Sequence, residues 1–321
     1  MPPVGEDQRV SRGANSTVRE GPNEHARIET LLTTLLPPQY QQTFEDVQPI
    51  SMGSAGLKFA ADGTVAWDEM WGSFCDLAMA GGPPHKGTLL EPGSESAIDA
   101  DFARYDEVVE EICRGIRMVT GLRAYPSPAP GWVRVACLNE AMSGWLLRAI
   151  TMENVSARRR GSVLELPASP HFRLEKEIKN VITVIAKTCH YWLGHMPAEQ
   201  QREIGELFMR MTAATPLLEP DRSGGSAKLD RGLVRQIAAR IERETDLRCV
   251  AGQYSGWLGV ECSTVAAAVW MMRALVAHNV LSRREGPVLF VPINAALDPS
   301  GDLVASAVAS VRRYASARGV V

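Results

Sequence analysis

Hydrophobic side chains recur at helical or strand spacing along most of the chain and divide it into short elements. Val108, Ile112 and Ile116 lie at helical spacing and predict a helix that ends at Gly121, a residue suited to a left-handed cap. The elements predicted around it are a helix over 103–120, strands over 122–125 and 132–138, a helix over 139–153 and a strand over 162–166. This stretch therefore alternates helices with short strands.

The same pattern occurs a second time at a constant distance. Residues 131–167 align without a gap to residues 256–292, because Trp257 minus Trp132 is 125. The matched pairs include Ile112/Ile237, Leu122/Leu247, Cys137/Cys262, Trp145/Trp270, Arg148/Arg273, Asn154/Asn279, Arg158/Arg283 and Arg159/Arg284. The chain thus contains an internal duplication, with two clear copies over about 101–167 and 226–292.

A weaker copy is predicted upstream. Trp71 stands 16 residues before Gly87 (87 minus 71), as Trp145 stands before Gly161, and each glycine opens a short strand that ends near proline. Asp62 and Gly63 lie between two β-prone runs, 50–61 and 64–67, which predicts a hairpin. Residues 68–80 then predict an amphipathic helix. We interpret this region as a divergent first unit.

The predicted fold class is α/β (mixed α+β), built from pseudo-symmetric helix–β-hairpin–helix–strand units. A helix that joins two neighbouring strands of one sheet makes them parallel, so we expect mixed sheets with helices on one face. The predicted organisation is a disordered leader over 1–26, a divergent unit over 27–100, a second unit with extra helices over 101–215, a linker over 216–228 and a third unit over 229–321.

The composition of the chain argues against several classes of partner and cofactor. Hydrophobic residues make up 45% of the chain, and the formal charge of −3 argues against nucleic acid as a partner. No apolar run approaches the roughly 18 residues that a membrane helix needs, so no membrane partner is expected. Six cysteines without metal-binding or CxxC spacing favour a cytoplasmic protein with free thiols. Nucleotide-binding motifs are missing, so we expect no organic cofactor.

Basic residues recur between the second helix and the last strand of each unit. These candidate anion ligands are His85, Lys86, Arg158, Arg159, Arg283 and Arg284. If the units close around an axis, the segments converge on a pocket for a carboxylate or phosphate, which arginine binds with two parallel hydrogen bonds. Cations and asparagines are also favoured at helix ends, so Asn154, Asn279 and the arginines have an equally good explanation as capping residues.

Three residues of the last unit are candidates for a reacting group. Cys262 lies at a strand end just before a helix, where a thiol becomes more acidic. Glu261 and His278 stand where the other copy has Ala136 and Glu153, and a catalytic copy is expected to differ from its duplicate at such positions. The alternative for Cys262 is a small buried hydrophobic side chain, and His278 has the alternative of a helix-end residue.

His190 and His195 do not predict a metal site, because a spacing of five places two residues on different faces of an α-helix. The favoured hypothesis is a cytoplasmic enzyme, a hydrolase or lyase, that acts on a small anionic metabolite at the junction of the units. The alternative is a non-catalytic ligand-binding or scaffold protein. In either case the repeated units offer an interface for a homo-oligomer.

Overall fold

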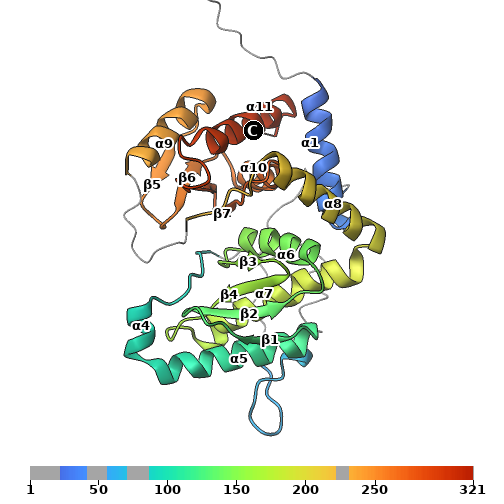
Figure 1. Cartoon of the computed structure of the whole chain (residues 1–321), viewed down its shortest axis with the longest axis vertical. Helices are drawn as coiled ribbons and strands as arrows, with labels where there is room; N and C mark the ends of the chain where they lie inside the picture. The colour runs from blue at the N-terminus through green and yellow to red at the C-terminus, as the bar shows by residue number, and fades with distance from the viewer. Residues whose placement is uncertain (1–21, 42–55, 71–86, 222–230, 321) are drawn as a thin grey trace, which may run out of the picture.

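The computed structural model describes residues 22–41, 56–70, 87–221 and 231–320, arranged as two lobes stacked along the longest axis (Figure 1). The first lobe comprises residues 87–195, and the second lobe comprises residues 217–221 and 231–320. Helices α1 (Pro22–Leu35) and α8 (Ala198–Ala214) run along one side of the stack. Within the described ranges, every helix is too short or too polar to cross a bilayer.

Both lobes contain the series helix, two strands, helix, two strands, helix, and the first lobe adds α4 and two π-helical turns. The first lobe contains α4 (Glu95–Ala100), α5 (Phe102–Thr120), β1 (Ala124–Pro126), β2 (Trp132–Ala136), α6 (Glu140–Met152), β3 (Arg158–Arg160), β4 (Val163–Pro167), the π-helical turn η1 (Leu174–Ile178), α7 (Lys179–His190) and the π-helical turn η2 (Tyr191–His195). The second contains α9 (Arg231–Thr245), β5 (Cys249–Ala251), β6 (Trp257–Glu261), α10 (Val265–Ala277), β7 (Arg283–Glu285), β8 (Val288–Pro292) and α11 (Asp302–Ala317). A short helix, α2 (Pro38–Gln41), follows α1.

Local sequence signals explain where the paired helices begin. The side chain of Asn139 accepts a hydrogen bond from the Met142 backbone N–H before α6, and Thr264 does the same for Ala267 before α10. Helix α5 ends at Gly121, whose φ of 68° is the expected left-handed cap. These caps fix the helices of the two copies in the same register.

The sheets are antiparallel throughout, which corrects the prediction of parallel neighbours. Their strand orders are β1-β2-β4-β3 and β5-β6-β8-β7, and every adjacent pair is antiparallel. The arginine segments, which the sequence places between the second helix and the last strand of a unit, form the additional strands β3 and β7. Helix α6 therefore joins β2 to β3, which run in the same direction but are separated by β4. The unit is helix–hairpin–helix–hairpin–helix.

The described residues also correct the alignment of the upstream copy. Leu90 forms a parallel bridge with Val155, just before β3, and Leu218 forms the equivalent bridge with Val280, just before β7. The tetrapeptide Leu-Leu-Glu-Pro occurs at 89–92 and again at 217–220. Residues 88–91 thus open the first lobe instead of closing an earlier unit. The corresponding part of the predicted linker, 217–221, is likewise paired with the second lobe.

The remaining upstream residues pack on the two lobes. Phe59 and Val65 form an antiparallel bridge around the tight turn at Gly63 (φ 83°), as the hairpin signal predicts. Trp67 donates a hydrogen bond to Glu111 of α5. Helix α1 begins at Pro22, inside the predicted leader, and its Ile28 and Leu32 join the core of the second lobe while Leu35 joins that of the first. Residues 42–55 and 71–86, which include most of the helix predicted over 68–80 and the candidate ligands His85 and Lys86, lie outside the described residues.

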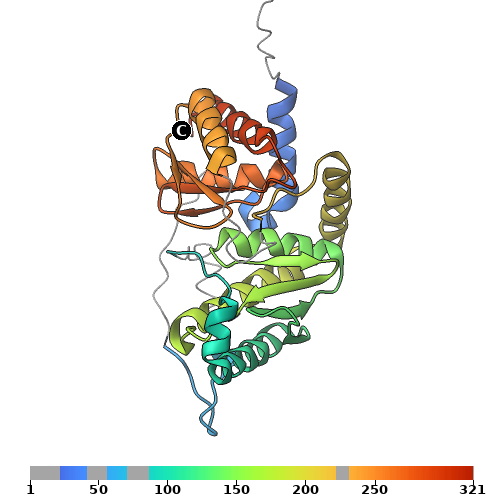
Figure 2. The same cartoon turned by 60° about the vertical axis from the view of Figure 1, so that its left-hand side comes forward.

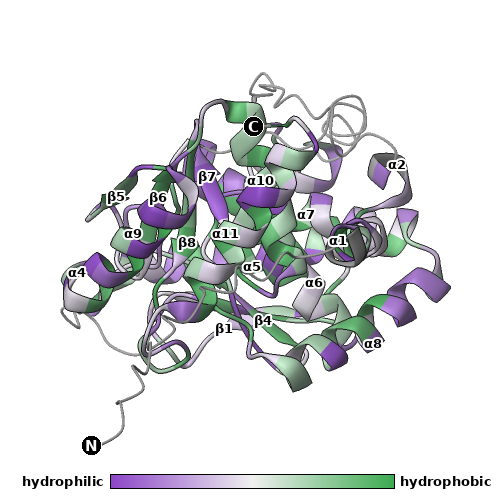
Figure 3. Ribbon diagram, turned by 90° about the horizontal axis from the view of Figure 1, so that it is seen from above, coloured by the Kyte–Doolittle hydropathy of each residue, from purple (hydrophilic) through white to green (hydrophobic). Residues whose placement is uncertain are grey.

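Each sheet packs one face on its own helices. In the first lobe Val133, Val135, Leu164 and Leu166 face α5 and α6 and are fully buried. Alternation along the strands places their neighbours on the opposite face. In Figure 2 the second lobe's strands lie between its helices and the first lobe, so its opposite face is covered. Hydrophilic β7 accordingly lies in the interior of the molecule, beside hydrophobic α10 (Figure 3).

Candidate functional site

Arg283 of β7 is a fully buried residue at the contact between the lobes. Its guanidinium carbon lies 4.0, 4.2 and 5.1 Å from the ring centres of Phe290, Tyr254 and Trp257. Its Nη1 donates hydrogen bonds to Glu285 Oε1 at 2.7 Å and to Asn154 Oδ1, in the first lobe, at 3.2 Å. Burial lowers the pKa of Arg283, and the adjacent Glu285 carboxylate opposes this. Arg283 therefore joins the two lobes and is closed to a dissolved ligand.

The matched asparagines reinforce this contact from both sides. Asn154 and Asn279 have φ values of 58° and 60°, the left-handed conformation predicted for them as capping residues. The Asn154 amide donates to the backbone carbonyl of Arg284 at 2.7 Å. Asn279 Oδ1 accepts a hydrogen bond from Arg148 Nη2 at 2.6 Å. Each asparagine thus ends a helix in its own lobe and bonds the other lobe.

Arg159 and Arg284 occupy the equivalent middle positions of β3 and β7, just before the hairpin turns. Each donates through Nη1 to the glycine carbonyl two residues on, Gly161 at 3.4 Å and Gly286 at 3.0 Å. Arg284 is only 3% exposed, and this burial lowers its pKa. A contact shared by both copies is typical of a common turn.

Arg158 of β3 has a different environment from its duplicate. It lies on the face of the first sheet that its helices leave uncovered, and its Nε donates to Glu165 Oε2 at 2.5 Å. Arg134 of β2 donates through Nε to the other oxygen, Oε1, at 2.9 Å. The Arg158 guanidinium carbon lies 4.2 Å from the ring centre of Trp132. One carboxylate therefore holds two arginines side by side across three strands; we call Arg134, Glu165 and Arg158 the arginine clamp.

Hydrogen bonding keeps the clamp charged. Burial would raise the pKa of Glu165, but hydrogen bonds from Ser127, Arg134 and Arg158 outweigh it and lower the pKa below its usual value. The Ser127 hydroxyl donates to Oε1 at 2.6 Å. The side chains of Arg134 and Arg158 remain 32% and 29% exposed. Two guanidinium groups thus reach the surface in fixed positions beside a single carboxylate.

The proposed reacting residues are not brought together. Cys262 is 9% exposed, and burial raises the pKa of its thiol to about 11, so the uncharged, weakly nucleophilic form prevails at neutral pH. Glu261 lies at the end of β6, 3.7 Å from exposed Arg248. His278 follows the far end of α10, a helix of 13 residues, and is therefore separated from Cys262 by roughly 20 Å at ~1.5 Å per residue. His85 and Lys86 lie outside the described residues.

The sequence interpretation missed Arg134 and Glu165. The signal was present in the alignment of the two copies, because Gly259 and Phe290 stand at the equivalent positions. In the second lobe Phe290 is 1% exposed and fills this face, whereas the first lobe carries a charged row there. A polar pair in one copy opposite a small and an aromatic residue in the other marks a change of role.

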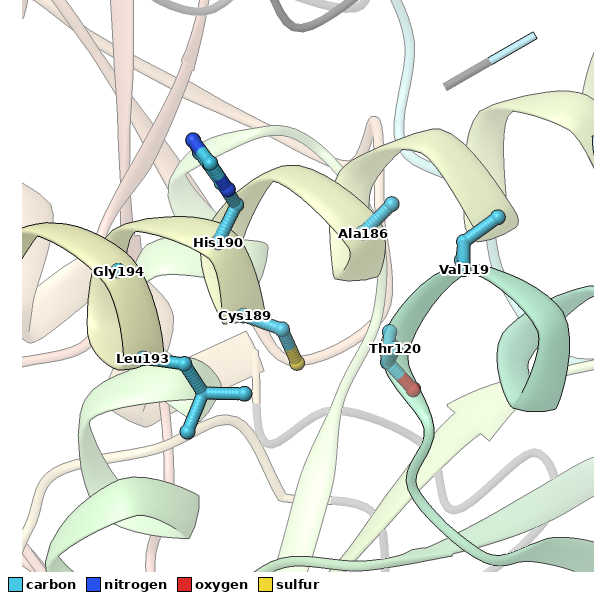
Figure 4. Close-up of a pocket in the computed structure, with 7 residues that line it drawn as sticks. All are labelled: Val119, Thr120, Ala186, Cys189, His190, Leu193 and Gly194. Atoms are coloured by element: carbon cyan, nitrogen blue, oxygen red, sulfur yellow. The ribbon is translucent and has the colours of Figure 1, made fainter. Parts of the chain in front are cut away.

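His190 and His195 lie together, contrary to the spacing argument. Their Nε2 atoms are 2.9 Å apart. The cause is η2, where the Met196 backbone N–H bonds the carbonyl of Tyr191, five residues back. A helix with this bonding brings residues five apart onto one face. A surface pocket of about 210 Å³ adjoins His190 and is lined by Val119, Thr120, Ala186, Cys189, His190, Leu193 and Gly194 (Figure 4).

No protein-family model, curated protein or solved structure matches the chain. A functional proposal therefore rests on the geometry of the described residues. Of the candidate anion ligands described, Arg158 lies partly exposed in a charged cluster, whereas Arg283 and Arg284 are buried between the lobes.

Proposed function

We propose that this protein is a non-catalytic binding protein for a carboxylate- or phosphate-bearing ligand, which it holds at the arginine clamp. The observation that carries the proposal is the way Glu165 engages both arginines through Nε. Among the described residues, no side chain or carbonyl occupies the Nη atoms of Arg134 or Arg158. Each guanidinium therefore keeps its outer pair of N–H groups for an anion, the arrangement that suits bidentate recognition.

The clamp is ordered before a ligand arrives. Arg158 is fixed by Glu165 and by the face of Trp132, and Glu165 is in turn fixed by Ser127. Binding then costs less side-chain entropy, since ordering a long side chain at an interface costs about 0.5–1.5 kcal/mol. Glu165 neutralises one of the two positive charges. The clamp retains a net positive charge, which attracts an anion.

Further arginines extend the positive face. Arg160 follows Arg158 by two positions on β3, and strand alternation places both on the uncovered face. Arg123 lies beside Tyr125, with its guanidinium carbon 5.2 Å from the ring centre, and Tyr125 pairs with Arg134 across β1 and β2. A ligand with more than one anionic group gains from these neighbours.

The catalytic hypothesis has less support. The clamp lies on the sheet face that the described helices of the first lobe do not cover, and Cys262 and His278 stand at opposite ends of α10 in the other lobe. No described cysteine, histidine or additional carboxylate is hydrogen-bonded to the clamp arginines. The arrangement provides recognition of charge without a reacting group beside it.

Calorimetric titration at low ionic strength tests the proposal, with inorganic phosphate and citrate as probes. For an exposed site of two arginines we expect citrate to bind with a Kd on the order of 1 mM, about −4 kcal/mol. The variant Arg134→Ala/Arg158→Ala should lose this binding. The matched control, Arg202→Ala/Arg210→Ala, removes two exposed arginines from α8 (65% and 68% exposed) and should bind as the unmodified protein does. Equal binding by both variants would overturn the proposal.

A further inference from the structure

The histidine pair at the end of α7 is independent of the arginine clamp. His190 is the last residue of α7, and His195 closes the π-helical turn η2. Their Nε2 atoms stand 2.9 Å apart, with ring centres at 4.7 Å and planes inclined by 71°. Both rings are partly exposed. Two imidazole nitrogens so placed either share one proton in a hydrogen bond or bind one cation together.

The distance suits two neighbouring ligands of one metal ion. Imidazole nitrogens bind first-row metals at ~2.0–2.1 Å, so two at right angles lie about 2.9 Å apart, and two in a tetrahedral site lie about 3.3 Å apart. The observed separation matches the right-angle arrangement, which square-planar and octahedral ions use. Histidines at positions i and i+4 of an α-helix form the well-known two-histidine metal face. The π-helical turn gives residues i and i+5 the same relation.

The surroundings leave room for further ligands. Both histidines are partly exposed, and even a Cβ added at Gly194, which lies between them in the sequence, would stand at an ordinary contact distance of 3.7 Å from the His190 ring. Figure 4 shows the His190 ring directed away from the Cys189 sulfur. Among the described residues, no group of three histidine, cysteine or acidic side chains could hold a metal. Water or an outside donor would fill the other positions.

We propose that His190 and His195 form a two-histidine binding site for a divalent transition-metal ion of square-planar or octahedral preference, Cu²⁺ above all and Ni²⁺ next. The ion is bound by the two Nε2 atoms and completes its coordination with water. Cu²⁺ is placed first because nitrogen sites bind it most tightly among the divalent first-row ions, and because tetragonal nitrogen and oxygen coordination is its preferred geometry.

The test is Cu²⁺ binding by the full chain without an affinity tag, measured by calorimetry and electron paramagnetic resonance in a weakly coordinating buffer. We expect saturation at one ion per chain and a spectrum with two equatorial nitrogens. His190→Ala and His195→Ala should each weaken binding by about 10²-fold, because a two-point attachment becomes a single contact. The control His171→Ala removes an exposed histidine outside the pair and should change neither result.

Two outcomes would overturn the site. The first is that His190→Ala and His195→Ala bind Cu²⁺ as tightly as the unmodified protein does. The other is the lack of a saturable one-to-one complex in the unmodified protein, which would mean that the imidazoles form a hydrogen bond only. If His195→Ala loses its fold, the spectrum of the unmodified protein still decides, because the number of equatorial nitrogens requires no variant.

Discussion

Replacing Arg283 by methionine tests whether this arginine joins the lobes. The bond to Glu285 is charge-assisted and contributes about 1.5–3 kcal/mol, and the bond to Asn154 contributes about 1 kcal/mol. The cation–π contacts with Tyr254 and Phe290 contribute at most about 2 kcal/mol. Against these, Arg283 Nε and Nη2 are buried and find no hydrogen-bond partner among the described residues, which costs about 1–3 kcal/mol.

Methionine at position 283 would keep part of the contact with the aromatic rings and would remove the unpaired N–H groups. Its thioether keeps contact with the rings, worth about 0.3–1.5 kcal/mol. Glu285 loses its cation and, among the described residues, keeps two neutral donors, the Leu89 backbone N–H at 3.2 Å and the Tyr254 hydroxyl. We therefore expect Arg283→Met to lower the free energy of unfolding by about 3 kcal/mol, within the range for breaking a buried ion pair. Urea denaturation followed by tryptophan fluorescence and circular dichroism measures it.

A second variant separates the ion pair from packing. Arg283→Met combined with Glu285→Gln removes the stranded carboxylate, so the double variant should be more stable than Arg283→Met alone. Arg202→Met, at an exposed position of α8, is the control and should change the free energy of unfolding by less than about 0.5 kcal/mol. A loss below about 1 kcal/mol for Arg283→Met, or a double variant less stable than the single one, would refute this reasoning.

Two other predictions concern titratable groups. Three cysteines should resist alkylation in the native protein at pH 8, because burial raises the pKa values of Cys113, Cys137 and Cys262 to about 11, 12 and 11. Alkylation followed by mass spectrometry measures this, and a cysteine among them that reacts as fast as it does in urea would contradict the prediction. Glu165→Gln should destabilise the protein at neutral pH. The pKa of Glu165 is lower in the folded protein than in the unfolded chain, so the charged carboxylate stabilises the fold above the unfolded pKa of about 4.3, and this stabilisation is lost as the pH falls through the folded pKa. The difference in unfolding free energy between the variant and the unmodified protein should therefore shrink below about pH 4. A difference that stays constant from pH 7 to pH 3 would contradict this prediction.

Periodicity predicted most helices because each one packs an apolar stripe. Residues 103–120 and 139–153 predict α5 and α6 closely, since Val108, Ile112, Leu146 and their neighbours are buried. The duplication added a second, independent copy of every signal. Elements defined by local spacing were therefore accessible from the sequence.

Strands β3 and β7, which hold the arginine segments, could not be predicted from the sequence in the same way. β3 and β7 are three residues long and polar, so they show no apolar alternation. What makes them strands is pairing with β4 and β8 around Gly161 and Gly286, whose φ values of 57° and 55° form the hairpin turns. The sequence pattern instead predicts that each of these glycines opens the next strand. Turn conformation, which sequence spacing does not reveal, decided the topology.

The candidate site was predictable only in part. Arg158 and Arg283 are the same residue type at equivalent positions of the two copies. Arg158 reaches the surface with Glu165 opposite it on β4, whereas Arg283 is buried with Phe290 opposite it on β8. Their environments depend on cross-strand partners and on how the lobes stack. The histidine pair depends on a π-helical turn, and the α-helical rule applied to the sequence gave the opposite answer.

The most direct test of anion binding at the arginine clamp is a citrate titration of Arg158→Lys at low ionic strength. Lysine keeps the positive charge but lacks the planar fork that binds Glu165 and lies on Trp132. If citrate binds at the arginine clamp, Arg158→Lys should raise the citrate Kd at least about tenfold, equivalent to about 1.4 kcal/mol. The control Arg202→Lys should leave the citrate Kd unchanged. A citrate Kd for Arg158→Lys equal to that of the unmodified protein would contradict binding at this site.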